Sequence, residues 1–392
     1  MIDVARVRAE TPATAERVFL NHAGASPSPD PVLEVVIGHL RDEARVGGYE
    51  AAEMSREELT ATRRSIARLV GCDPDGVALM TSATDAWESA FWSMTWKPGD
   101  VVLTCRSEYV TNVVNLLVAR ERFGVDVRVV DDDEHGQIDL ASLERHLDTA
   151  EVRLMALSHV PTHGGLVNPA AEVGARCRSA GVTFLLDACQ SVGQLPLDLS
   201  QLGCDVLTAT GRKFLRAPRG SGFMACRSDF AEQARPLGSA GAVWTTADSF
   251  DLPTGAARFE RYERSVAAAL GLGVAVDYAL GLGLEEIARR IDLLATHLRS
   301  HLDEIPSVTV RDLGEHRCGI VTFTVDGVDP DLIRSELDTE NISVWTSGAP
   351  LARIDLDARG IDAVVRASVH YLNTLDELDR TIESVERIVA GR

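Results

Sequence analysis

The chain has 392 residues, of which 45% are hydrophobic and 25% charged, a balance typical of a globular protein and not of a disordered or membrane-embedded one. It carries 39 Lys and Arg against 59 Asp and Glu, so the formal net charge is -20. Such a surplus repels phosphate backbones and anionic lipids, which makes nucleic acid and membranes poor candidate partners.

The N-terminal segment and the cysteines indicate a cytoplasmic protein. Residues 1–20 carry scattered charges and no apolar stretch that could act as an export signal. The apolar run Val266–Val276 is well short of the ~20 residues of a membrane-spanning helix. The seven cysteines stand singly without a C-x-x-C pair, so neither a disulfide framework nor a metal site is expected.

The first two predicted helices are Pro31–Val46 and Ser55–Val70, separated by Gly47, Gly48 and Tyr49. From about Val77 to Phe223, short β-branched runs then alternate with amphipathic stretches, which predicts parallel strands joined by crossover helices. The predicted strands are Val77–Thr81, Val101–Cys105, Val127–Val130, Leu154–Ser158, Val182–Asp187, Val206–Ala209 and Gly222–Cys226. The predicted helices between them are Asp85–Trp96, Val110–Phe123, Leu140–Leu147 and Pro169–Ala180. We therefore expect a three-layer α/β sandwich around a mainly parallel seven-stranded sheet.

After Phe223 the pattern changes to that of a smaller α+β domain. Arg264–Leu298 has the spacing of a long helix. The predicted strands are Val308–Val310, Gly319–Val325, Ile342–Trp345 and Val364–Val369, and the predicted helices are Pro330–Leu337 and Leu375–Val389. We expect a large domain over residues 16–260 and a small domain over residues 261–392, with residues 1–15 packed on the small domain.

Polar residues follow the predicted strands at the ends where α/β sheets bind ligands. Thr81–Asp85 opens a helix and suits either a phosphate on free N–H groups or a simple N-cap by Ser82 or Thr84. Asp187 ends an apolar strand and needs a cationic partner, which Lys213 could supply as an ion pair. Tyr109 would face the same crevice or pack in the core.

The motifs Asp187-Ala-Cys-Gln190 and Thr210-Gly-Arg-Lys213 resemble the D-x-x-Q and S/T-x-x-K patterns of the class V aminotransferase family. The resemblance implies a fold-type-I pyridoxal phosphate enzyme in which Lys213 is the catalytic residue and holds the cofactor as a Schiff base. It also implies that Asp187 pairs with the pyridine nitrogen and that Gln190 touches the ring hydroxyl. The other implied cofactor contacts are Tyr109 on the ring, Thr162 at the ring hydroxyl, and Ala83, Thr84, Thr210 and Arg212 at the phosphate.

The segment from Val365 to Thr374 resembles the family's R-x-S segment. This likeness implies that Arg366 grips the substrate's α-carboxylate through a bidentate pair, although alone it would be read as a surface salt bridge. The family builds its sites at a subunit boundary, so a homodimer acting on a small amino acid is expected.

One departure from the family pattern and one closer resemblance narrow the expected activity. The cysteine desulfurase branch of the family carries a nucleophilic cysteine shortly before this arginine, whereas Val344–Leu351 contains none, so a desulfurase is disfavoured. The segments Val46–Glu53 and Arg212–Gly220 resemble the carbon–sulfur lyases of ergothioneine biosynthesis and the related lincosamide enzymes. By that likeness, the residues expected to bind substrate at the entrance are Asn21, His22, Ala23, Gly48 and Tyr49.

These resemblances predict β-elimination on an S-substituted L-cysteine, of the hercynylcysteine sulfoxide or S-glycosyl cysteine type, which gives a thiol or sulfenate, pyruvate and ammonia. The same site could instead carry out a decarboxylating oxidative deamination, a transamination or an epimerisation. A non-enzymatic pyridoxal-binding scaffold is a further alternative and would need Lys213 to be idle. His159 and His163 have a metal-like spacing, but Pro161 places them in a loop, so no metal is expected.

Overall fold

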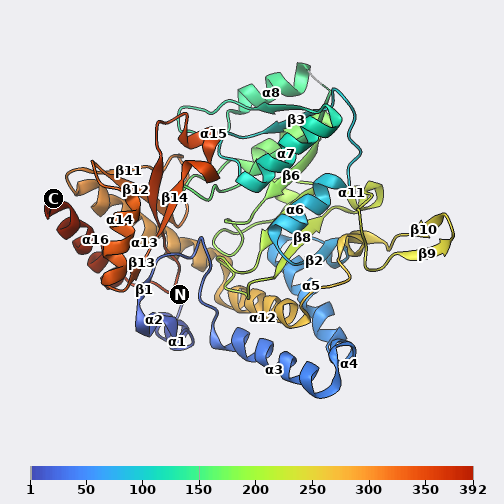
Figure 1. Ribbon diagram of the computed structural model, residues 1–392, viewed down its shortest axis with the longest axis horizontal. Coiled ribbons are helices and arrows are strands. Elements are labelled where there is room, and N and C mark those ends of the chain that lie inside the picture. The colour runs from blue at the N-terminus through green and yellow to red at the C-terminus, as the bar shows by residue number, and fades with distance from the viewer. Residues whose placement is uncertain (1, 150, 392) are drawn as a thin grey trace.

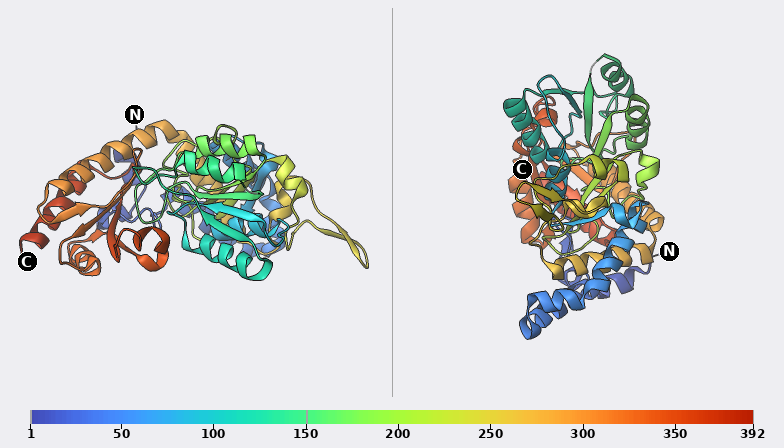
Figure 2. Two further views of the ribbon diagram at one scale, coloured as in Figure 1. Left: turned by 90° about the horizontal axis from the view of Figure 1, so that it is seen from above. Right: turned by 90° about the vertical axis from the view of Figure 1, so that its right-hand side faces the viewer.

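The computed structural model describes residues 2–149 and 151–391. A large domain with helices on both faces of a central sheet lies beside a smaller domain, and the N-terminal segment runs beneath the junction (Figures 1 and 2). The sheet has the strand order β2-β8-β7-β6-β5-β3-β4. Its strands are β2 (Val77–Met80), β3 (Val101–Thr104), β4 (Asp126–Val129), β5 (Val152–Ser158), β6 (Thr183–Asp187), β7 (Val206–Thr210) and β8 (Gly222–Cys226).

The expected fold class is confirmed. Every predicted strand of the large domain is present, and only β8 runs antiparallel to its neighbours β2 and β7. All residues of β2, β3, β7 and β8 are buried, as expected for strands covered on both faces. The parallel strands β3, β5, β6 and β7 therefore end at one edge of the sheet, where ligands bind in such folds.

The large domain's helices lie on both faces of the sheet (Figure 2). They are α3 (Asp30–Val46), α4 (Gly48–Met54), α5 (Arg56–Val70), α6 (Ala83–Trp92), α7 (Val110–Phe123), α8 (Leu140–Thr149), α9 (Ala170–Ala180), α10 (Leu199–Leu202), α11 (Ser228–Gln233) and α12 (Val266–Leu282). Several of these helices, α5, α7 and α9 among them, end at a glycine in the left-handed conformation, for example Gly124 after α7 at φ 71°.

The boundary between the domains differs from the expected one at residues 260/261. Helix α12 packs against α3 and α5 and gives Leu272, Ala275 and Val276 to the large domain's core. Its sequence is apolar on all sides, which suits a helix enclosed by others. Among the described residues no single helix is long and apolar enough to cross a membrane, and α12 with α13 passes such a test only as a pair bent by 79°.

The small domain is a four-stranded antiparallel sheet covered by helices. Its strand order is β11-β12-β15-β14. The strands are β11 (Val308–Val310), β12 (Ile320–Val325), β14 (Trp345–Gly348) and β15 (Ala363–Ser368), and the helices are α13 (Leu284–Glu304), α14 (Pro330–Thr339), α15 (Arg353–Leu356) and α16 (Leu375–Ala390). The single strand expected at Ile342–Trp345 is divided, because β13 (Ile342–Ser343) pairs with the N-terminal β1 (Val18–Phe19) while β14 joins β15.

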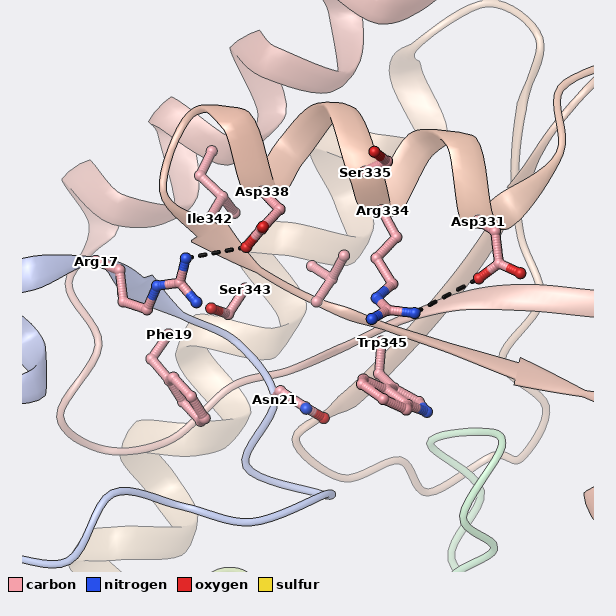
Figure 3. A pocket seen from close by; sticks show the side chains of 11 residues that line it. Arg17, Phe19, Asn21, Asp331, Arg334, Ser335, Asp338, Ile342, Ser343 and Trp345 are labelled. Carbon is pink, nitrogen blue, oxygen red and sulfur yellow. Dashed lines mark hydrogen bonds and ion pairs between the residues drawn. The ribbon is translucent and has the colours of Figure 1, made fainter.

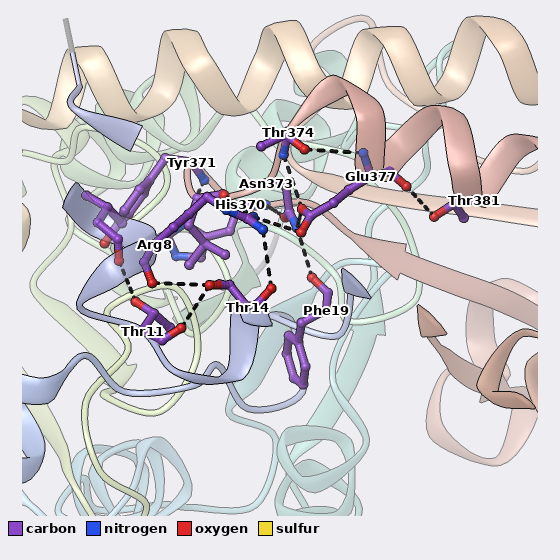
Figure 4. A network of polar contacts seen from close by, with 12 residues as sticks. Arg8, Thr11, Thr14, Phe19, His370, Tyr371, Asn373, Thr374, Glu377 and Thr381 are labelled. Carbon is purple, nitrogen blue, oxygen red and sulfur yellow. Dashed lines mark hydrogen bonds and ion pairs between the residues drawn. The ribbon is translucent and has the colours of Figure 1, made fainter. Parts of the chain in front are cut away.

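The N-terminal segment contains α1 (Val4–Ala9) and α2 (Ala13–Glu16) and is tied to the small domain (Figure 4). Arg8 donates to the Leu372 carbonyl at 3.0 Å and forms an ion pair with Glu377 at 2.8 Å. Asn373 donates to the Phe19 carbonyl at 3.1 Å. These contacts join the N-terminal segment to β15's following loop and to α16 of the small domain. It also touches the large domain, because Tyr278 of α12 donates its hydroxyl to Glu10 at 2.5 Å.

A β-hairpin that the sequence analysis did not predict projects from the large domain (Figure 2, left). It consists of β9 (Val243–Thr246) and β10 (Ser249–Asp251). Trp244 is 79% exposed and Phe250 is 61% exposed. The hairpin therefore exposes two large aromatic side chains to solvent on a two-stranded arm.

Candidate active site

A hollow opens at the carboxyl ends of the parallel strands and brings together most of the predicted cofactor residues. Those that line it include Ala83, Thr84, Tyr109, Asp187, Thr210, Arg212 and Lys213. They come from the loops after β2, β3, β6 and β7, so residues spread over 130 positions in the sequence meet because their strands are neighbours.

Lys213 follows β7 and is buried in the hollow, where its Nζ lies 3.4 Å from the Cys189 sulfur. The chain has one other lysine, Lys97, which is exposed. Burial lowers the pKa of the Lys213 amine, because desolvation disfavours the ammonium form. A larger fraction of this amine is therefore neutral near pH 7, and only the neutral form can attack an aldehyde or accept a proton.

Asp187 ends β6, and its carboxylate is held by two donors. Its Oδ1 accepts from the Cys189 N–H at 2.9 Å, and its Oδ2 accepts from Asn112 Nδ2 at 3.0 Å. Burial raises the pKa of Asp187, while the hydrogen bond from Asn112 opposes that rise. A bound cation would remove the remaining cost of burying this charge. A protonated pyridine nitrogen is such a cation.

The N-terminus of α6 forms the opposite end of the hollow. Ser82 caps this helix by accepting from the Asp85 N–H at 3.0 Å, so the N-cap interpretation is correct. The N–H groups of Ala83 and Thr84 in the first turn do not donate to Ser82. They suit an anion, which the helix dipole also favours. At Gly222 a Cβ would lie 2.7 Å from the Ser82 carbonyl carbon, so only glycine lets β8 approach this turn.

Gln190 links the cofactor side of the site to the substrate side. Its Nε2 donates to Thr162 Oγ1 and to the Ala23 carbonyl, each at 3.2 Å. Its Oε1 is buried and has no hydrogen-bond partner among the residues that the structure describes. A buried acceptor without a donor is costly, and a ring hydroxyl would satisfy it. With Lys213, Asp187 and the α6 N-terminus, this oxygen fits pyridoxal phosphate.

Arg366 of β15 points from the small domain to the same place and is not a surface residue. Its Nη1 donates to the Thr162 carbonyl at 2.8 Å and to Thr162 Oγ1 at 3.0 Å, and its Nη2 donates to Asn21 Oδ1 at 3.1 Å. Burial lowers the pKa of Arg366 to about 10, which still leaves it charged at neutral pH. Its Nε has no partner among the described residues, and a substrate carboxylate would supply one.

A second hollow of about 500 Å³ lies between the small domain and the N-terminal segment (Figure 3). We call it the outer hollow; Asn21, Arg334, Ser343 and Trp345 line it. Trp345 of β14 stands directly across from Arg366 of β15, so both side chains lie on one face of the sheet. The Arg334 guanidinium lies 4.2 Å from the Trp345 ring centroid. Asn21, which accepts from Arg366, is thus also part of the wall of the outer hollow.

The structure does not bring all five expected entrance residues to the site. Asn21 and the Ala23 backbone are there, through Arg366 and Gln190. The His22 ring is fully buried, contacts Ser26 Oγ at 2.9 Å, and has a pKa that burial lowers to about 3, so it is a packing residue. Gly48 and Tyr49 of α4 line a separate hollow, and Tyr49 is 82% exposed.

Some residues near the site were missed or interpreted differently. Asn112 donates a hydrogen bond to Asp187 and was not predicted as a site residue. An asparagine within a helical segment carries no sequence signal for a partner 75 positions away. Arg216 follows Lys213 with a φ of 63° and turns to Pro27 and Tyr371, at 3.0 and 3.1 Å, so it does not serve an anion. His159 and His163 bind different partners and do not converge.

Comparisons with known proteins agree with this geometry. Residues 18–381 match the family described as Aminotransferase class-V. A probable cysteine desulfurase from Methanothermobacter thermautotrophicus is 27% identical, with 97% of each chain covered. A cysteine desulfurase from Pectobacterium atrosepticum is 26% identical, with 98% of each chain covered.

Solved structures share the fold. The apo structure of cysteine desulfurase from Thermococcus onnurineus has a TM-score of 0.90 at 24% identity and covers 100% of this chain and 99% of its own. A mutant of C-DES with glycine covalently linked to its pyridoxal phosphate cofactor has a TM-score of 0.86 at 24% identity, with 97% and 98% covered.

These findings correct the expected activity. The relatives are named cysteine desulfurases, so the predicted β-elimination on an S-substituted L-cysteine is wrong, and so is the judgement that a desulfurase is disfavoured. The relatives reported above are named as desulfurases and not as ergothioneine-type or lincosamide-type lyases. The error came from giving one position before Arg366 more weight than the rest of the chain. A thiol that accepts sulfur need not belong to the chain, whereas the cofactor residues must.

The expectation of pyridoxal phosphate is confirmed by the match to the class V aminotransferases over residues 18–381 and by the cofactor in the solved C-DES structure. The chain belongs to the class V aminotransferase family.

Proposed function

We propose that this protein is a pyridoxal phosphate enzyme that removes the sulfur atom from L-cysteine, as a desulfurase does. The observation that carries the proposal is the convergence of three buried groups from two domains: the Lys213 amine, the Asp187 carboxylate and the Arg366 guanidinium. The full-length likeness to proteins named cysteine desulfurases supports the choice of substrate.

Each of the three groups has a distinct task. Arg366 binds the α-carboxylate and is kept rigid by Thr162 and Asn21, so it orients the amino acid before reaction. Asp187 keeps the pyridine nitrogen protonated. When bound, pyridoxal phosphate supplies an electron sink for charge that develops on the substrate's carbon atoms. Lys213 would hold the cofactor and, when its amine is free, would take the proton from the α-carbon and return a proton to the product.

The sulfur acceptor is proposed to be an external thiol. Residues 319–392 contain no cysteine, and Cys189 is the thiol nearest to Lys213. Burial raises the pKa of the Cys189 thiol, which keeps it protonated and a poor nucleophile. With an external thiol RSH, the balance is L-cysteine plus RSH giving L-alanine plus RSSH. One carbon–sulfur bond breaks, one sulfur–sulfur bond forms, and no oxidant is needed.

We further propose that the protein acts as a homodimer in the cytoplasm. Trp244 and Phe250 of the projecting hairpin are exposed, and contact with a second copy of the chain would remove these apolar side chains from water. Gly48 and Tyr49, which lie apart from the site in their own chain, remain candidates for the partner's entrance.

The test is a product assay with L-cysteine and dithiothreitol. We expect alanine and sulfide in equal amounts, with Lys213→Ala as the inactive control. Pyruvate and ammonia in place of alanine, or no product at all from the yellow holoenzyme, would reject the proposed reaction.

A further inference from the structure

A buried polar network leads from Asp187 through Asn112 to Glu108. Asn112 of α7 donates from Nδ2 to Asp187 Oδ2 at 3.0 Å and to Glu108 Oε1 at 2.9 Å. Its two amide hydrogens therefore serve two carboxyl groups. Glu108 and Asn112 are each 2% exposed and Asp187 is 7% exposed, so this network of three side chains is largely shielded from water.

Glu108 is fixed by three further contacts. Its Oε1 accepts from the Tyr109 N–H at 2.8 Å and from Ser158 Oγ at 2.5 Å, and its Oε2 lies 3.1 Å from Thr104 Oγ1. Within the described part of the chain, no lysine or arginine forms an ion pair with this carboxyl. A buried acid without a cation is usually protonated. Burial does raise the pKa of Glu108.

A neutral Glu108 satisfies every one of these contacts. Oε1 can accept all three donors, and a proton on Oε2 can be donated to the Thr104 hydroxyl. A charged Glu108 would instead place a second negative charge next to Asp187, across a single amide. The arrangement therefore suits one neutral and one charged carboxyl bridged by Asn112.

We propose that Glu108 and Asn112 are positioning residues that keep Asp187 ionised and oriented toward the pyridine nitrogen of pyridoxal phosphate. Glu108 accepts one N–H of Asn112 and so fixes the direction of the other. That second N–H stabilises the negative charge of Asp187, which in turn keeps the pyridine nitrogen protonated. The inference concerns the cofactor alone and does not depend on which amino acid is the substrate.

The experiment measures two properties of the holoenzyme that do not involve turnover. One is the dissociation constant of pyridoxal phosphate, and the other is the 15N chemical shift of its labelled pyridine nitrogen, which reports protonation. Asn112→Ala and Asn112→Asp remove the donor to Asp187. Each is expected to weaken cofactor binding about tenfold or more, as for a lost hydrogen bond to a buried charge, and to shift the signal toward the unprotonated form.

Two further variants separate this role from general packing. Asn115→Asp makes the same change one turn along α7, where the amide donates to Glu88 at 3.1 Å, and it should leave both readouts unchanged. Glu108→Ala should weaken the cofactor like Asn112→Ala, and Glu108→Gln should restore binding, because a neutral amide can make the same contacts. Restored binding in Glu108→Gln also shows that the effect is not misfolding.

Three results would overturn the inference. The first is wild-type affinity and an unchanged nitrogen signal in both Asn112 variants. The second is Glu108→Gln being as weak as Glu108→Ala, which would show that Glu108 acts as a charge. The third is an equal loss in Asn115→Asp, which would make the effect one of helix stability. Failure of L-cysteine as substrate would leave all of these measurements unaffected.

Discussion

The two sides of the site are built differently. On the large-domain side, Asp187, Gln190 and Lys213 follow adjacent strands and match the family pattern. Each has its own polar partner: Asn112 for Asp187, Thr162 for Gln190 and Cys189 for Lys213. On the small-domain side, Arg366 is held by a loop and by the N-terminal segment, and the segment Val344–Leu351 before it contains no cysteine.

This difference suggests a division of tasks: the large-domain side handles the cofactor, and the small-domain side affects how sulfur is transferred. The groups that handle the cofactor must be placed relative to one ring, so they sit on the rigid sheet. The group that accepts sulfur can come from outside, so the loop that would carry it can change without harm to the cofactor site. The large-domain side should therefore govern whether the enzyme works, and the small-domain side what it works on.

The largest expected effect is on the large-domain side. Lys213→Ala should abolish the visible band of the holoenzyme and lower turnover by at least about a thousandfold, because it removes both the attachment point and the base. Absorbance and product assays measure the two losses. Lys97→Ala, the only other lysine change available in this chain, should behave as wild type. A normal band in Lys213→Ala would contradict the assignment of the cofactor lysine.

The next largest effect should be on substrate binding, with cofactor binding unchanged. Arg366→Ala is expected to lower kcat/KM for L-cysteine by about a hundredfold or more, because a buried charged partner of the carboxylate is lost. Its visible band should remain. Arg334→Ala, which removes the exposed guanidinium over Trp345, should stay within about threefold. Equal losses in the two variants would show that Arg366 is not the carboxylate ligand.

A smaller effect is expected where the two sides meet. Thr162→Val removes the hydroxyl that accepts from both Gln190 and Arg366, so kcat/KM should fall by about tenfold, as for the loss of a hydrogen bond to a charged group. Thr162→Ser keeps the hydroxyl and should restore most of the loss. The interpretation fails if the serine variant is as impaired as the valine variant.

The smallest effect concerns His22 and stability. Burial lowers its pKa from the unfolded value of 6.5 to about 3, so the folded chain keeps it neutral while the unfolded chain binds a proton. Its stabilising effect is complete above pH 6.5 and is lost as the pH falls toward 3. When the pH is lowered from 7 to 5.5, the unfolding free energy of the wild type should fall by about 1 kcal/mol more than that of His22→Asn. Equal losses in urea unfolding would show that His22 is solvated.

The sequence predicted the large-domain side well because its signals are local. Asp187 and Lys213 stand next to strands whose apolar runs are unmistakable, so parallel topology alone places them together. The small-domain side depends on pairings between distant segments, such as Asn21 with Arg366 and β1 with β13, which no local pattern encodes. His22 was misplaced for the same reason, since its neighbour His370 is 348 positions away.

The central claim is that the sulfur acceptor is an external thiol and not a cysteine of this chain. Its most direct test is a single-turnover experiment with the holoenzyme in excess over L-cysteine. Without an added thiol we expect no alanine and no persulfide on the chain. With an added small thiol, alanine should form in an amount equal to the cysteine, and the persulfide should be found on that thiol. Alanine formed without any added thiol, together with a persulfide on Cys189 by mass spectrometry, would contradict the account.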